Sequence, residues 1–112
     1  MNGIYLKFYV HENRRHHGIL AYEWLLEQAR ALGVPGGSAF RAIAGFGRHG
    51  VMHEEHFLEL AGSQPVEVGF VMSDEAQARQ FLDHLRGEHL QLFYIMLPLS
   101  YGLTGDGADA GP

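Results

Sequence analysis

Hydrophobic and polar residues alternate along the chain in a way that predicts several β-strands. In residues 4–10 every second position is apolar, and residues 66–72 repeat this spacing. Residues 38–46 are a less regular strand candidate, because their apolar side chains fall on both faces. Residues 90–97 are apolar on both sides and predict a last strand.

Two other segments place apolar residues three or four positions apart, which predicts amphipathic helices. The first segment covers residues 19–32, and Gly33 directly after it is typical of a helix end. The second begins with Asp74 and Gln77, which have the spacing of a capping box, and we expect it to end at Gly87.

The predicted order of elements is β-α-β-β-α-β, with the polar residues 11–18 as a loop. Two right-handed crossovers of this kind predict an α+β, ferredoxin-like sandwich, with a four-stranded antiparallel sheet and both helices on one face. A chain of 112 residues has room for one such domain. We assign it to residues 1–100 and expect residues 101–112 to form a flexible, glycine-rich tail.

Two helices cover only one face of a sheet, yet the other face of these strands is also apolar. The first strand places Tyr5 and Tyr9 there. The last strand adds one of two sets, either Phe93, Ile95 and Leu97 or Leu92, Tyr94 and Met96. Because a large apolar patch usually marks an interface, we expect this face to pack against copies of itself in a closed oligomer. The alternative is that the tail folds back over it.

The amino-acid composition argues against several classes of partner and site. Thirteen acidic residues against eight basic ones give a net charge of −5, which argues against nucleic-acid binding. The absence of cysteine excludes disulfides and thiolate metal sites. No apolar run reaches the roughly 20 residues of a membrane helix, and the chain does not open on a signal-peptide pattern. We therefore expect a cytoplasmic protein without membrane insertion.

The glycine-rich segment Gly45-Phe46-Gly47-Arg48 is the clearest candidate for ligand binding. Its glycines allow positive φ angles and close approach to a ligand, and exposed amides in such a turn can bind an anion. Arg48 would add a forked charge suited to phosphate or carboxylate. The alternative is a flexible hairpin whose glycines only relieve strand twist.

Histidines supply two further candidates. His49, His53 and His56 would share one face of a helix and could bind zinc, copper or nickel, or they belong to a solvated loop or an oligomer interface. The basic residues 14–17 either bind an anion or form a solvated turn, and we expect Glu12 to pair with one of the arginines there. No nucleophile, base and orienting group can be named together, so we expect a binding protein and not an enzyme.

Several of these motifs occur in an order that resembles a known family. They are Tyr22-Glu23, Leu32-Gly33, the stretch Arg41-Ala42-Ile43-Ala44-Gly45-Phe46-Gly47, His53, and Gln64-Pro65-Val66. From Ile4 to about Leu97 the chain resembles the PII-like bacterial family called domain of unknown function 190, and more distantly the PII signalling proteins.

The resemblance implies a homotrimer with its sheets facing inward and ligand clefts between neighbouring subunits. In PII proteins these clefts hold adenine nucleotides, and the loop after the second strand docks a target protein, often a transporter or an enzyme. Carried over, the ligand-binding residues are Arg41, Gly45, Phe46, Gly47, Arg48 and His49. PII proteins have glutamine and lysine where this chain has His49 and Gly50, which argues against ATP with 2-oxoglutarate as the ligand.

The sequence therefore predicts a trimeric regulator in which a small anion, such as an adenine nucleotide, orders the 46–57 loop for a partner protein. One alternative is a metal-responsive protein that uses His49, His53 and His56. Another is an oligomeric scaffold without a ligand. The residues alone identify no cofactor.

Overall fold

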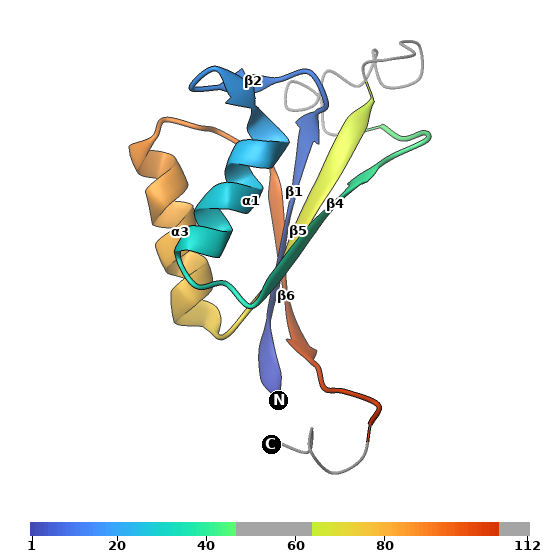
Figure 1. The fold of residues 1–112 in the computed structure, drawn as a ribbon, viewed down its shortest axis with the longest axis vertical. Coiled ribbons are helices and arrows are strands. Elements are labelled where there is room, and N and C mark those ends of the chain that lie inside the picture. The colour runs from blue at the N-terminus through green and yellow to red at the C-terminus, as the bar shows by residue number, and fades with distance from the viewer. Residues whose placement is uncertain (47–63, 106–112) are drawn as a thin grey trace.

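Four antiparallel strands form one sheet, and two helices pack on one of its faces (Figure 1). In the computed structural model, which describes residues 1–46 and 64–105, the strands lie in the order β4-β5-β1-β6. Their bounds are β1 (Asn2–His11), β4 (Gly36–Arg41), β5 (Pro65–Met72) and β6 (Tyr94–Ser100), and the helices are α1 (Ala21–Ala31) and α3 (Glu75–Gly87). This topology confirms the ferredoxin-like sandwich that the sequence predicted. No helix in these two ranges is long and apolar enough to cross a membrane.

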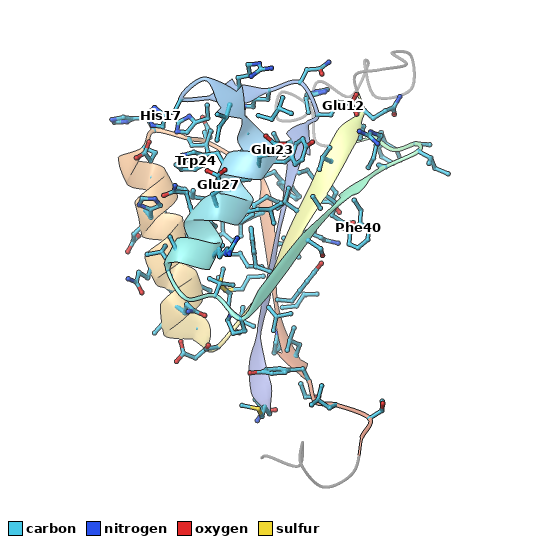
Figure 2. All side chains as sticks on the ribbon, viewed as in Figure 1. Glu12, His17, Glu23, Trp24, Glu27 and Phe40 are labelled. Carbon is cyan, nitrogen blue, oxygen red and sulfur yellow. The ribbon has the colours of Figure 1, made fainter. Side chains whose placement is uncertain are left out.

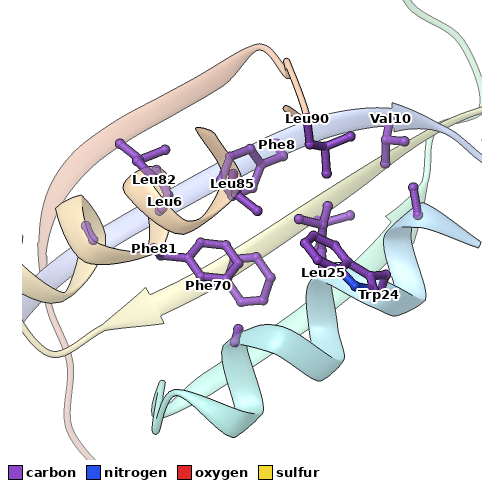
Figure 3. Packing of buried hydrophobic residues seen from close by; sticks show 14 of the residues in the cluster. Leu6, Phe8, Val10, Trp24, Leu25, Phe70, Phe81, Leu82, Leu85 and Leu90 are labelled. Atoms are coloured by element: carbon purple, nitrogen blue, oxygen red, sulfur yellow. The ribbon is translucent and has the colours of Figure 1, made fainter. Parts of the chain in front are cut away.

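The core lies between the sheet and the helices (Figure 3). Alternate residues of β1 and β5 point into it, as the period of two in the sequence predicted. At its centre the rings of Phe8, Phe70 and Phe81 meet edge to face, with centroids 5.4–6.2 Å apart. Each such aromatic pair contributes about 0.5–1.5 kcal/mol beyond the apolar area it buries.

The strand bounds differ from expectation at both uncertain strands. β4 covers residues 36–41 instead of 38–46, and β6 covers residues 94–100 instead of 90–97. Leu90 belongs to the end of α3, because its amide donates to the Leu85 carbonyl while its side chain is buried in the core. The apolar run at residues 90–97 gives no sign of where the helix end gives way to the strand, since both kinds of element bury apolar side chains.

Both helices end in a Schellman motif, in which two amides beyond the helix donate back to its last turn. At α1 the left-handed residue is Gly33, with φ of +81°, as the sequence predicted. At α3 it is His89, with φ of +58°, so the helix ends at Gly87 as the sequence predicted, although this glycine is not the left-handed residue. Gly87 is the last helical residue of α3.

The loop expected at residues 11–18 contains a small hairpin instead. Its strands are β2 (Arg15–His16) and β3 (Ile19–Leu20), and α1 begins directly afterwards at Ala21, not at residue 19. The two turn residues, His17 and Gly18, both have positive φ, as a two-residue type I′ turn requires. Strands of two residues are too short for hydrophobic periodicity to reveal.

The strand register decides which apolar set lies on the open face of the sheet. Tyr5 pairs with Leu97, and Lys7 pairs with Ile95, so these side chains share the face away from the helices. Tyr94 and Met96 pack toward the core. Phe93 joins the open face through its ring, which lies 6.1 Å from that of Tyr9. The first of the two predicted sets is therefore the observed one.

Candidate ligand site at the end of the sheet

An arginine and a glutamate meet where β1 and β4 end. Arg41, the last residue of β4, donates from Nε to Oε1 of Glu12 over 2.6 Å. Glu12 directly follows β1, and β5 lies between the two strands. The expectation that Glu12 pairs with an arginine of residues 14–15 is therefore wrong. The sequence alone does not predict the pair of Arg41 and Glu12, because the two residues are far apart along the chain and only the order of strands in the sheet brings them together.

Backbone hydrogen bonds brace the same end of the sheet. The Ala42 amide donates to the Pro65 carbonyl over 2.8 Å, and the Glu12 amide donates to the Gln64 carbonyl over 2.9 Å. Figure 2 shows Glu12 at this end, beyond the start of β5. The chain thus leaves β4 from a fixed base, directly before the glycine-rich segment.

The guanidinium of Arg41 keeps donors available for a further acceptor. The hydrogen bond that Arg41 donates to Glu12 raises the pKa of Arg41 above its ordinary value, so the group is charged at any physiological pH. Glu12 accepts from Nε, whereas a guanidinium carries five N–H donors in a fixed fork. The Arg41 side chain is exposed, which lets its terminal nitrogens reach a phosphate or carboxylate in solution.

The segment after Arg41 presents apolar side chains to solvent. Ile43 is 97% exposed and Phe46 is 83% exposed. Apolar side chains that are this exposed do not stabilise an isolated domain, and they are typical of surfaces that contact another molecule. Gly45 does not have positive φ, and a side chain there would meet open space. The predicted left-handed conformation is therefore not found at Gly45, and the position is free for close approach by another molecule.

The remaining predicted site residues divide into two groups. Gly47, Arg48, His49, His53 and His56 lie outside the described residues, so their roles stay predictions. Of the basic residues 14–17, Arg14 directly precedes the hairpin and the other three belong to it; there the Arg15 guanidinium donates to the Gly18 carbonyl over 3.1 Å.

A cleft of about 350 Å³ lies at the outer edge of the sheet, between α1 and the start of β4. Its walls are mainly apolar, with Leu26, Ala29, Val34 and Phe70 among them, and Arg30 is its one charged residue. Few polar groups are present to orient a nucleotide, so the Arg41 end of the sheet is the better candidate.

Solved structures with the same fold belong to PII-like proteins. A putative PII-like signalling protein from Thermus thermophilus has a TM-score of 0.58 at 17% identity, over 88% of this chain and 86% of its own. CPII, a nitrogen regulatory PII-like protein from Thiomonas intermedia K12 solved with ADP, AMP and bicarbonate, has a TM-score of 0.60 at 15% identity, over 88% and 87% of the two chains.

Sequence comparison leads to the same group. A UPF0166 protein from Aquifex aeolicus (strain VF5) is 32% identical over 84 residues, which are 75% of this chain and 79% of that protein. The model of the family DUF190, described as "Uncharacterized ACR", matches residues 3–93. With most of the domain matched and the PII-like fold in place, the chain belongs to the DUF190 family.

Proposed function

We propose that this chain is a PII-like regulatory protein that forms a homotrimer through its open sheet face. An adenine nucleotide or a similar small anion binds at the subunit boundary beside Arg41. The bound ligand orders the 46–57 loop, and this loop then docks on or releases a partner protein, such as a transporter. The protein acts by binding and not by catalysis.

The composition of the open sheet face is the observation that carries this proposal. Its side chains are largely apolar, including Leu97 at 49% exposure and Phe40 at 61% exposure. No helix of the described ranges covers this face (Figure 1). A second copy is the occupant that matches it, because the patch continues across all four strands and would be buried by an equivalent sheet.

The polar part of this face supports self-association as well. Lys7, the only lysine of the chain, forms an ion pair of 2.6 Å with Glu67. The Tyr9 hydroxyl donates to the same carboxylate over 3.3 Å. The charges therefore neutralise each other within one subunit, which lowers the cost of burying them against a neighbour.

Two observations support the ligand. Arg41 offers charged donors at a braced strand end, and the sequence continues from there into Gly45, Gly47 and Arg48. CPII has been solved with ADP and bicarbonate, and also with ADP, AMP and acetate. All of these molecules are anions, which an exposed guanidinium binds well.

Calorimetric titration with ADP and AMP tests the ligand. Because a hydrogen bond to a charged group is worth about 1.5–3 kcal/mol, we expect Arg41→Ala and Arg48→Ala each to weaken ADP binding roughly tenfold or more. Arg79→Ala is the control, because Arg79 is also exposed and also paired with a glutamate, Glu75, on α3. Equal affinity in all three variants, or no heat with either nucleotide, contradicts the proposed ligand.

A further inference from the structure

Two histidines and a glutamate converge at the far end of the helix layer. His16 and His17 each direct Nε2 at Oε1 of Glu88, over 3.1 Å and 2.6 Å. One donor atom from each of the three residues lies within 4.8 Å of the other two. None of these residues belongs to the sheet end that carries Arg41.

The fold builds this cluster from segments that are about 70 residues apart. His16 lies at the end of β2, and His17 is the first residue of the hairpin turn. Glu88 is the C-cap of α3, and its amide donates to the carbonyls of His84 and Leu85 in the last turn of the helix. Figure 2 shows His17 and Trp24 at this end of the molecule, where the hairpin meets α3.

We propose that His16, His17 and Glu88 bind a divalent transition-metal ion, zinc in the first place. Two imidazole nitrogens and one carboxylate oxygen are a donor set that zinc uses, and three protein ligands leave a fourth position open for water or a ligand. The site differs from the His49, His53 and His56 set that the sequence suggested, and it does not depend on the proposed function.

The geometry is close to what zinc requires. Bonds of about 2.0–2.1 Å in a tetrahedron separate two ligand atoms by roughly 3.3 Å. The observed Nε2–Oε1 distances are 3.1 Å and 2.6 Å. The side chain of His17 is 62% exposed and that of Glu88 is 29% exposed, so both can turn to widen their separation by the roughly 0.7 Å that a metal needs.

The indole of Trp24 orients the inner ligand. Its ring is buried and lies 4.4 Å from the His16 ring in an edge-to-face contact, and the His16 side chain is only 16% exposed. The His84 ring stacks on Trp24, with the ring centroids 5.9 Å apart, and His84 Nε2 forms a hydrogen bond of 2.7 Å with Oε1 of Gln28. One ligand is therefore fixed by packing while the other two stay adjustable, which suits a site that loads from solution.

Without a metal, the same contacts are hydrogen bonds that attach the hairpin to α3, so the test must distinguish the two roles. His17→Asn does this, because Asn-Gly is the favoured pair for a type I′ turn. The variant keeps the hairpin and loses the imidazole. His89→Asn is the matched control, since among the described histidines His89 is the other one with positive φ, and it lies next to Glu88 outside the cluster.

The measurement uses untagged full-length protein stripped of metal with a chelator. Zinc is titrated by calorimetry, and nickel is titrated by quenching of Trp24, which is the only tryptophan and lies beside the site. We expect about one zinc per chain at this site and strong quenching by nickel. We expect His17→Asn and Glu88→Gln each to weaken the affinity for zinc and the affinity for nickel roughly tenfold or more.

A third arm excludes the other histidines. The variant His49→Ala/His53→Ala/His56→Ala and the control His89→Asn are expected to retain the nickel quenching and the zinc equivalent of this site. Unchanged zinc affinity and quenching in His17→Asn overturn the proposal. Loss of both signals only in the variant of residues 49, 53 and 56 overturns it as well.

Discussion

At the scale of single residues, backbone conformation separates glycines that look alike in the sequence. Gly33 and Gly87 both follow an amphipathic stripe, and both have open space where a Cβ would lie. Gly33 has φ of +81°, whereas Gly87 is an ordinary helical residue. His89 adopts the left-handed conformation in its place, which costs a non-glycine residue about 1 kcal/mol.

These two glycines give a paired prediction. Gly87→Ala stabilises the protein by about 0.5–1 kcal/mol, because alanine loses less backbone entropy in a helix. Gly33→Ala destabilises it by about 1 kcal/mol, because alanine is strained at positive φ. Urea denaturation of both variants measures the difference. Shifts of the same sign would contradict the assigned helix ends.

At the scale of elements, the two helices begin differently. Asp74 caps α3 by accepting from the Gln77 amide over 2.8 Å, which confirms the predicted cap. The Gln77 side chain reaches back to the amide of Ser73, one residue before the cap. α1 has Leu20 at this position and no side-chain cap, because it follows directly from the β2–β3 hairpin. The hairpin, and not a polar side chain, fixes where α1 begins.

We therefore expect α3 to depend on its cap. Asp74→Ala removes the acceptor for the Gln77 amide and lowers the free energy of unfolding by about 1 kcal/mol. The midpoint of urea denaturation falls while the slope stays the same. Asp83→Ala is the control, because Asp83 is an exposed partner of Arg86 within the helix. An equal loss in the two variants would show that the cap contributes nothing of its own.

At the scale of the whole molecule, residues 1–46 and 64–105 leave one apolar face of the sheet without a covering layer. Both described helices lie on one side of the sheet, and its other side carries Tyr5, Tyr9, Phe93, Ile95 and Leu97. A sheet normally buries its apolar face against another element. In this molecule, we expect a further copy of the chain to take that place.

Two separate variants test the assembly, one with a new charge on the open sheet face and one with a new charge on the helix side. Leu97→Asp places a carboxylate on the open face and is expected to convert a trimer into 12.5 kDa monomers. Ala76→Asp places the same charge on the exposed first turn of α3, and the trimer persists. Light scattering at micromolar concentration reports the mass. A wild-type protein that is monomeric under these conditions contradicts the assembly.

The sequence by itself determined the order of the four sheet strands and two helices along the chain, and with it the ferredoxin-like fold, because periods of two and of three to four residues depend only on neighbouring positions. The ordered motifs from Tyr22-Glu23 to Gln64-Pro65-Val66 indicated the family. Tertiary structure decided what depends on distant pairs. It selected the outward set of β6 through its register with β1, joined Glu12 to Arg41 across β5, and brought Glu88 to His16 and His17. Short-range patterns carry no information on such contacts, since the packing of whole elements sets them.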